Sequence, residues 1–291
     1  MKRCVVISTL LTCLLCPWLE SGRADASEGQ DDDPQAQGIS TCPVVISSPG
    51  NYELTADLTC GGGDGITINS SDVHLKLEGH KITADAGANS AIYVNRGGLV
   101  TLDRVRISGP GLITNSGNTF LWGVELNTVN HSQIRELTVV GSRQDGISAY
   151  NCNFLVIRSN VVGRNQQNGI FLSSVHSSDI SRNDASGNGI GMQIIGSGTD
   201  NTVSHNIING NDVGLIIGSG ASVHNNVTIG NRYNGIDVYG PNVEVSNNTS
   251  LTNGTYGFVN ADYDLFDHTA DCSGNVWSDN TFFTANQSCI R

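Results

Sequence analysis

Short runs in which apolar and polar residues alternate recur along most of this chain. Ile66 and Ile68 flank a threonine, and Val73, Leu75 and Leu77 alternate with histidine and lysine. A period of two residues is typical of β-strands with one buried face. Glycine and asparagine are frequent, and no long stretch has the 3.6-residue period of an amphipathic helix. The pattern therefore predicts an all-β chain.

The runs begin at regular intervals, each opened by a small residue that is followed by an apolar one. From Gly123 onward the intervals are 23, 23, 22, 23, 21 and 22 residues. A constant period of this length indicates a solenoid, and the L-x-x-L-x-L pattern of leucine-rich repeats is absent. We predict a right-handed parallel β-helix solenoid of about nine coils. The coils open at Gly65, Ala91, Gly123, Gly146, Gly169, Gly191, Gly214, Gly235 and Gly257.

Two columns of asparagine follow the same period, five residues apart. Asparagine tolerates a left-handed corner and can hydrogen-bond to the same residue of the next coil, so we expect stacked amide ladders. Asn275 and Asn280 repeat the five-residue step once more near the end of the chain. The first column is Asn160, Asn183, Asn206, Asn226 and Asn248, and the second is Asn165, Asn188, Asn211, Asn231 and Asn253.

The N-terminus has the features of an export signal. Lys2 and Arg3 precede an apolar stretch at residues 5–15 that is too short to span a bilayer, and an Ala-Asp-Ala cleavage site ends at Ala26. We expect residues 1–26 to be a signal peptide and residues 27–38, with three consecutive aspartates, to be a disordered acidic leader. Residues 39–291 then form a single β-helix domain in the periplasm or outside the cell.

Five cysteines remain after the signal peptide. In an oxidising compartment the natural local pairs are Cys42 with Cys60 and Cys272 with Cys289. Each would close a loop of about 17 residues and contribute about 3 kcal/mol. We expect them to secure an N-terminal cap at residues 39–64 and a C-terminal cap at residues 258–291, because open solenoid ends expose strand edges. Cys152 is expected to be a buried, stacked side chain.

The two ends of this domain resemble a known group of proteins. The motifs SPGNYEL at residues 48–54, GITI at residues 65–68 and LEGHKI at residues 77–82 look like the start of bacterial right-handed β-helix repeat proteins. The segment GNVWSDNTF at residues 274–282 is similar to their usual ending. This resemblance places the chain in the pectin-lyase-like superfamily and implies polysaccharide lyases, glycosidases or uronan epimerases as relatives. Many members have no assigned activity, and fold analogy alone does not give function.

Catalytic groups of a β-helix enzyme would stand at outward positions of the first strand in each coil. Glu125 and Asp237 are the acids in this column, but they are five coils and roughly 24 Å apart, too far to cooperate as a glycosidase pair. Asp145 occupies a slot that asparagine fills elsewhere, so we interpret it as a ladder residue. The Ser-His-Gly and Arg-Ile-Lys motifs of polygalacturonases are absent. The column is Thr67, Tyr93, Glu125, Ser148, Phe171, Gln193, Ile216, Asp237 and Val259.

A lyase or epimerase needs a base and a group that neutralises a uronate carboxylate. No Asp-Pro-His motif of alginate epimerases is present. No cofactor is expected, and Ca²⁺ is only a weak alternative. The aspartates at positions 262, 264, 267 and 271 depart from the spacing of a calcium-binding loop. We interpret them as a solvated loop. His205 and His224 fall on adjacent coils, but no third metal ligand lines up with them. The candidate catalytic residues are Arg143, Tyr150, Arg164, His176 and Glu125.

Four aromatic side chains face outward from the same sheet. Amphipathic rings on a rigid face suit stacking against sugars, although loops such as residues 118–122 could instead cover them. The candidate substrate-binding residues are Tyr93, Tyr150, Phe171 and Tyr239.

The formal net charge of −12 argues against nucleic acid as a partner. We expect a secreted monomer without a transmembrane segment that engages a polysaccharide or cell-envelope glycan along its first sheet. The sequence leaves open whether it is an enzyme; a uronan lyase or epimerase is favoured over a glycosidase. The alternative is a non-catalytic envelope or extracellular scaffold or binding protein.

Overall fold

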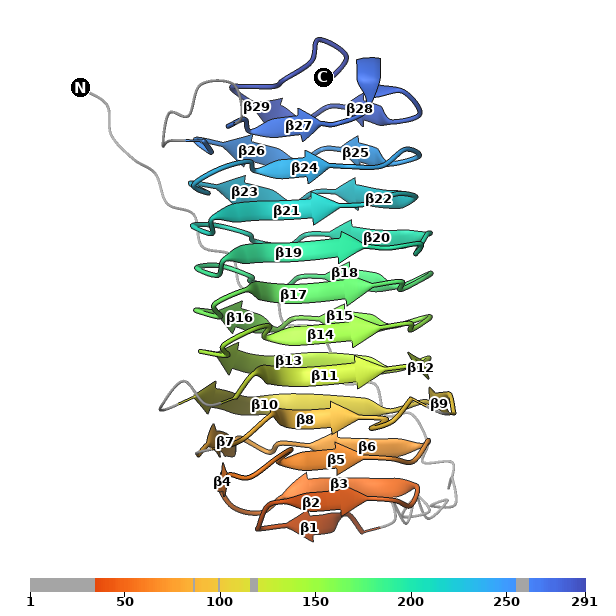
Figure 1. Cartoon of the computed structure of the whole chain (residues 1–291), viewed down its shortest axis with the longest axis vertical. Helices are drawn as coiled ribbons and strands as arrows, with labels where there is room; N and C mark the ends of the chain where they lie inside the picture. The colour runs from red at the N-terminus through yellow and green to blue at the C-terminus, as the bar shows by residue number, and fades with distance from the viewer. Residues whose placement is uncertain (1–34, 86, 99, 116–119, 255–261) are drawn as a thin grey trace, which may run out of the picture. The chain divides into compact units, whose positions relative to one another are not determined.

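The computed structural model describes residues 35–85, 87–98, 100–115, 120–254 and 262–291. The short alternating runs form strands that stack in parallel, and the chain winds upward as a right-handed parallel β-helix (Figure 1). The predicted solenoid is therefore confirmed. The predicted signal peptide and most of the acidic leader lie outside the described residues. The first strand, β1, already begins at Gln37, two residues before the expected start of the domain.

One side of the solenoid is a ten-stranded parallel sheet, to which each coil contributes one strand. Its strands are β2 (Val44–Ile46), β5 (Ile66–Ile68), β8 (Ser90–Val94), β11 (Trp122–Asn127), β14 (Ile147–Tyr150), β17 (Asn168–Ser173), β19 (Ile190–Ile195), β21 (Val213–Ile217), β24 (Ile236–Val238) and β27 (Leu265–Asp267).

The opposite side is a 14-stranded sheet that packs its apolar face against the first. Its strands are β1 (Gln37–Ile39), β3 (Gly50–Leu54), β4 (Leu58–Cys60), β6 (Val73–Lys76), β7 (Lys81–Ala84), β10 (Arg106–Asn115), β13 (Gln133–Val140), β15 (Val156–Arg158), β16 (Val161–Gly163), β18 (Asp179–Ser181), β20 (Asn201–Ser204), β22 (Ala221–His224), β25 (Glu244–Ser246) and β28 (Val276–Ser278).

Two small sheets and one short helix complete the described elements. β9 (Leu102–Asp103) pairs with β12 (Val129–Asn130), and β23 (Val227–Ile229), β26 (Thr249–Leu251) and β29 (Thr281–Phe282) form a three-stranded sheet. A single 3₁₀ turn spans Ala270–Cys272. No helix among the described residues is long and apolar enough to cross a membrane.

The core is a stack of inward Ile, Val and Leu side chains bordered by the two predicted asparagine ladders. A typical member, Asn206, is fully buried; its Oδ1 accepts hydrogen bonds from the backbone N–H and Nδ2 of Asn183. Its own Nδ2 donates to Ile180 O at 2.9 Å and to Asn226 Oδ1 at 2.9 Å. Each amide thus has hydrogen-bond partners in the coils on both sides, as a buried polar group requires.

The C-terminal end of the ladders differs from the sequence prediction. Asn280 continues the first column, because its Oδ1 accepts from Asn248, whereas the five-residue step had placed it in the second. The second column ends on Asp264, whose Oδ1 accepts from the N–H and Nδ2 of Asn253. Asn275 belongs to a different stack and accepts from Val243 N. The tail takes a longer path to the ladder than the earlier coils do, so equal spacing misassigned the columns.

Two of the four tail aspartates contradict the expectation of a solvated acidic loop, whereas Asp271 is exposed as expected. Asp264 and Asp267 are each 1 % exposed. The Asp264 Oδ2 accepts from the backbone of Phe283 and Thr284, and the Asp267 carboxylate accepts from Trp277 Nε1 and other donors. Protein donors therefore surround both carboxylates, and neither is arranged as a calcium ligand.

Both predicted disulfides are present, Cys42–Cys60 in the first coils and Cys272–Cys289 in the tail. Cys152 is free and buried, as expected; its thiol donates to Tyr150 O and contacts Val129 N. Burial raises the pKa of this thiol to about 11. Cys152 is therefore an inert packing residue rather than a reactive thiol.

Candidate functional site

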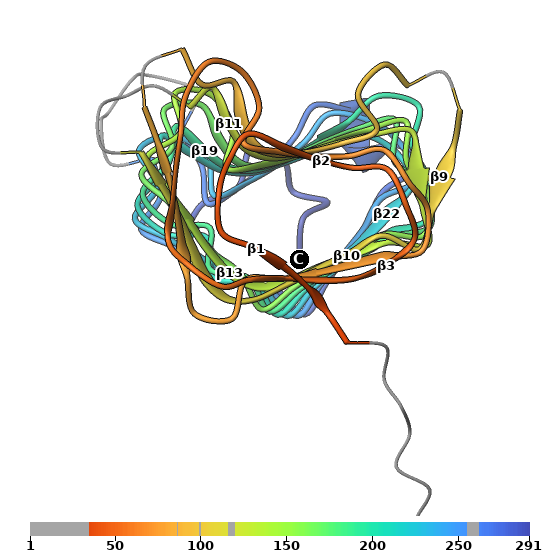
Figure 2. The ribbon, with the colours of Figure 1, turned by 90° about the horizontal axis from the view of Figure 1, so that it is seen from below.

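The outer face of the ten-stranded sheet carries the column of side chains expected from the sequence. The pairing register places them side by side in the order Thr67, Tyr93, Glu125, Ser148, Phe171, Gln193, Ile216 and Asp237. Val259, expected next, lies outside the described residues, and β27 places Phe266 beside Asp237 instead. Near the N-terminal end of the stack, turns on both flanks of the sheet rise beyond this face (Figure 2, orange and yellow).

A cavity of about 250 Å³ opens on this face over β8 and β11. We call the residues around it and on the adjoining coil the acidic–aromatic cluster, which comprises Asp64, Ser90, Tyr93, Arg96, Trp122, Glu125, Asp145 and Tyr150. Six of these residues line the cavity, and Asp145 and Tyr150 follow on the next coil.

Glu125 is the central carboxylate of the acidic–aromatic cluster. The Ser90 hydroxyl donates to Glu125 Oε2 at 2.9 Å. Burial raises the pKa of Glu125, and the charge of Asp145 adds to the increase, whereas the Ser90 hydrogen bond and the charge of Arg96 oppose it. A carboxyl group of this kind holds its proton at a higher pH than an exposed glutamate does.

Arg96 supplies the positive charge at the rim of the cavity. Its guanidinium forms an ion pair with the Asp64 carboxylate, and it lies 5.6 Å from the centre of the Tyr93 ring. The arginine is thus fixed between a carboxylate and an aromatic face, an arrangement in which its planar group stacks and pairs at once.

Asp145 has two roles. The backbone N–H and Nδ2 of Asn168 donate to its Oδ1 at 3.1 and 2.7 Å, so it is the ladder residue that the sequence suggested. It is also 3 % exposed, and burial raises its pKa. Its charge acts on both Glu125 and Tyr150. The Glu125–Asp145 pair was not predicted from the sequence, because the two acids occupy different positions on neighbouring coils.

Tyr150 extends the aromatic surface toward the middle of the sheet. Its ring lies 5.6 Å from that of Phe171, tilted by 58°. Burial and the charges of Asp145 and Glu125 raise the pKa of Tyr150 to about 12. The phenol is therefore protonated at neutral pH and can donate a hydrogen bond, but it is a poor base.

The structure does not gather the residues selected for lyase or epimerase chemistry. Arg143 and Arg164 precede β14 and β17 and are exposed on one flank of the sheet. His176 follows β17 on the other flank, where its Nδ1 accepts from Thr199 N at 3.2 Å. Only Glu125 and Tyr150 of the five candidates belong to one cluster.

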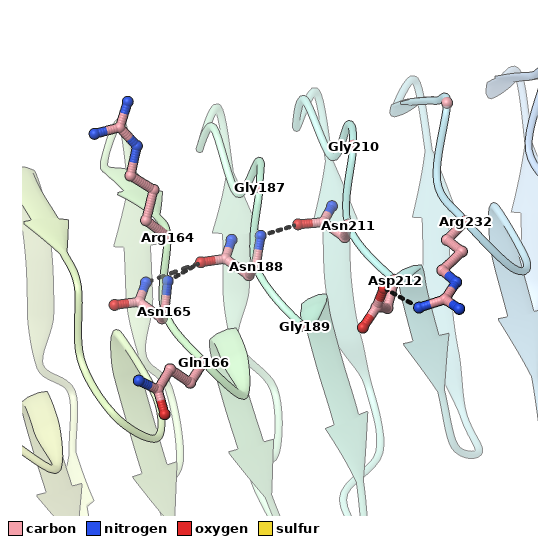
Figure 3. Close-up of a pocket in the computed structure, with 11 residues that line it drawn as sticks. Arg164, Asn165, Gln166, Gly187, Asn188, Gly189, Gly210, Asn211, Asp212 and Arg232 are labelled. Carbon is pink, nitrogen blue, oxygen red and sulfur yellow. Dashed lines mark hydrogen bonds and ion pairs between the residues drawn. The ribbon is translucent and has the colours of Figure 1, made fainter. Parts of the chain in front are cut away.

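Arg164 lines a separate hollow of about 490 Å³ along the corner that leads into the sheet. Figure 3 shows its floor, where Asn165, Asn188 and Asn211 bond in sequence along the second ladder. At the far end the Arg232 guanidinium lies 3.6 Å from Asp212. This hollow shares no lining residue with the cavity of the acidic–aromatic cluster, and its floor is the second ladder itself.

Comparison with known families gives one match, over residues 39–282, to the family described as periplasmic copper-binding protein (NosD). The chain belongs to the NosD family. No curated protein matches it. This NosD-family chain is similar in fold to the tailspike protein of E. coli bacteriophage HK620, solved in complex with a pentasaccharide: TM-score 0.56 and 14 % identity, over 88 % of this chain and 52 % of the tailspike.

The Dettilon tailspike protein gives a TM-score of 0.55 at 18 % identity, over 84 % of this chain and 53 % of that one. A mutant of the periplasmic alginate epimerase AlgG gives 0.47 at 16 % identity, over 82 % and 74 %. The NosD-family chain spans about half the length of the two tailspikes. The tailspike matches show the shared parallel β-helix fold.

The family description raises the question of whether these residues fit copper, which histidine, cysteine and methionine hold in proteins. No group of three or more His, Cys, Asp or Glu converges within the described residues, which include all seven histidines. Met192 and Cys152 are fully buried in the core. His205 and His224 stand with ring centres 6.0 Å apart, and Asn225 contacts the His224 Nδ1. The donor set in this part of the chain does not fit a copper centre.

Proposed function

We propose that this protein binds an extended glycan along the outer face of its ten-stranded sheet, in the periplasm or outside the cell. The observation that carries the proposal is the acidic–aromatic cluster. Tyr93 and Trp122 at the cavity and Tyr150 on the next coil offer ring faces for stacking, and Glu125 offers an acceptor for sugar hydroxyls. Aromatic platforms with a few fixed polar groups are the usual composition of such sites.

The charges favour a neutral glycan over a polyuronate. Asp64 and Glu125 line the cavity, the charge of Asp145 acts on Glu125 from the next coil, and Arg96 is already paired with Asp64. A uronate carboxylate entering here would meet like charges, in a chain whose net charge is −12. The fold itself supports glycan binding, because the HK620 tailspike with the same architecture was solved with a pentasaccharide.

Binding can be tested with a glycan array followed by calorimetry on the best ligands. We expect neutral oligosaccharides to bind, and Tyr93→Ala and Trp122→Ala to weaken binding about tenfold each, the loss of roughly 1.4 kcal/mol of stacking. Phe154→Ala is the matched control, because Phe154 is an exposed aromatic that stacks on His131 at a corner away from the cluster. Binding that survives both cluster variants, or no glycan binding at all, would overturn the proposal.

A second candidate function is proton transfer to or from the bound glycan by Glu125. The raised pKa of Glu125 and its contact with Ser90 support this role, since a buried carboxyl that retains its proton can act as a general acid. Tyr150, with its pKa raised to about 12, does not suit the role of lyase base.

The test is a reducing-end assay on every neutral glycan that binds, with an unsaturated-uronate assay for any uronan that binds. If Glu125 is catalytic, Glu125→Gln abolishes turnover while binding persists. If no bound glycan is turned over by the unmodified protein, the site is a binding site without catalysis, as in the scaffold or binding-protein alternative.

A further inference from the structure

A second polar unit lies on the same outer face, at its C-terminal end. Asp237 projects from β24 and is 4 % exposed. Its Oδ1 lies 2.9 Å from Nε2 of His268, which follows β27, and its Oδ2 accepts a hydrogen bond from Asn234 Nδ2 at 3.0 Å. The carboxylate is thus held on both oxygens, and one of its two partners is an imidazole.

The Asp237–His268 pair is not part of the ladders that stabilise the solenoid. At the same register the two preceding coils carry Gln193 and Ile216, which pack without any ionic partner. The neighbouring Asp267, by contrast, is a structural carboxylate filled by several protein donors. Among the described coils this column therefore carries an Asp–His pair only at Asp237, unlike the ladder amides, which recur from coil to coil.

Two aromatic rings bracket the His268 imidazole. The Tyr239 ring stacks on it with centres 3.9 Å apart and planes at 19°, and the Phe266 ring lies 4.5 Å away at 50°. Tyr239 itself is 54 % exposed. One face of the Tyr239 ring therefore rests on the imidazole while much of its surface is open to solvent.

The hydrogen bond to Asp237 also sets the tautomer of the imidazole. An ionised carboxylate accepts the Nε2 proton, so Nδ1 of the neutral ring carries the lone pair. No residue in the described part of the chain donates to Nδ1. A hydrogen-bond acceptor, fixed in direction by a buried carboxylate, thus lies beside an open aromatic platform.

We propose that Asp237, His268 and Tyr239 form a second glycan subsite, which stacks a neutral sugar ring on Tyr239 and accepts a sugar hydroxyl at His268 Nδ1. It rests on the proposed function only in the class of ligand, because none of its residues belongs to the acidic–aromatic cluster. Asp237 and Glu125 stand five strands apart on the sheet, roughly 24 Å. A uronate is disfavoured here as well, since it would meet the like charge of the Asp237 carboxylate beside His268.

The two subsites can be tested separately by NMR on the purified protein with maltohexaose, cellohexaose and chitohexaose as neutral probes. Two-bond ¹H–¹⁵N spectra of the free protein should show His268 protonated at Nε2. We expect at least one probe to shift the His268 ring signals and to receive saturation transfer from Tyr239. Tyr239→Ala should weaken that interaction three- to tenfold, and His268→Gln should weaken it without changing the melting temperature.

Phe283→Ala is the control, because Phe283 is a highly exposed aromatic next to β29, outside the ten-stranded sheet. Unchanged binding in the Tyr93→Ala and Trp122→Ala variants, with the His268 shifts retained, would overturn the first site and leave the second standing. An Nδ1-protonated His268, or His268 signals that none of the three probes moves at millimolar concentration, would overturn the second.

Discussion

Asp145 and Asp264 both occupy ladder slots, but their carboxylates differ in the number of donors around them. Asp145 accepts two hydrogen bonds on one oxygen, from Asn168. Asp264 accepts four, two on each oxygen, from Asn253 and the backbone of residues 283 and 284. A buried charge that few donors reach destabilises the fold, whereas one filled by donors stabilises it. The same substitution should therefore have opposite effects at the two positions.

We predict that Asp145→Asn stabilises the protein at pH 7. Burial raises the pKa of Asp145 above the unfolded value near 3.8, so the folded state favours the protonated form. Stability from this group is complete below the unfolded pKa and falls as the pH rises through the raised pKa. The advantage of the variant should accordingly grow between pH 4 and pH 7 in urea unfolding. An advantage that is equal at both pH values would contradict the assignment.

Asp264→Asn is the matched control and should be destabilising by about 1–3 kcal/mol, because an amide nitrogen would face backbone donors. Its melting temperature should fall at pH 7, opposite in sign to Asp145→Asn. A neutral result for Asp264→Asn would mean that the four hydrogen bonds do not hold the tail.

At this scale the sequence predicts which residues face outward but not which of them meet. Tyr93, Glu125 and Asp237 follow from the two-residue alternation, and the register confirms their column. The Glu125–Asp145 pair was missed because it joins different positions of neighbouring coils. His268 was missed because it follows β27, after a tail segment that does not keep the coil period.

Among the elements, the asparagine ladder links each coil to the next more specifically than the apolar core does. Asn206 makes four hydrogen bonds inside the stack, all to buried partners. Asn280 makes the same kind of bonds at the end of the same column but is only half-buried, and one of its acceptors is the carbonyl of Arg291. The two positions separate the contribution of the amide from that of its burial.

We predict that Asn206→Ala lowers the free energy of unfolding by about 3 kcal/mol, because it leaves buried donors and acceptors of two coils unpaired. Asn280→Ala should lower it by about 1 kcal/mol, since water can replace the lost amide there. Chemical unfolding of both variants gives the comparison. Equal losses would show that ladder burial contributes nothing beyond the hydrogen bonds themselves.

The coil elements were predictable because each repeats the same physical requirements: a small residue at the opening, alternating apolar residues and an amide at the corner. The tail was not. The strand expected at Gly257 lies outside the described residues, and β27 supplies the partner of β24 from further along the chain. An aspartate then takes the slot of an asparagine, so neither the period nor the residue type marks the end of the ladder.

Across the solenoid, the repeated coils form one continuous outer sheet face that carries two polar clusters. The acidic–aromatic cluster and the Asp237–His268 pair are separated by strands β17, β19 and β21, with Phe171, Gln193 and Ile216 between them. Because the strands are fixed by parallel pairing, this separation does not change with local motion. A ligand that reaches from Glu125 to Asp237 must be an extended chain of about 24 Å or more.

We therefore predict that glycan affinity rises with oligomer length until the ligand reaches both clusters and then levels off. Linking two weak contacts through one ligand makes the second contact effectively intramolecular, which raises affinity without any new interaction. Calorimetry with a length series of the best neutral glycan should show this rise, and Tyr239→Ala should remove it while leaving the affinity for the shortest binding oligomer unchanged. A length dependence that persists in Tyr239→Ala would mean that the ligand leaves the sheet before it reaches β24.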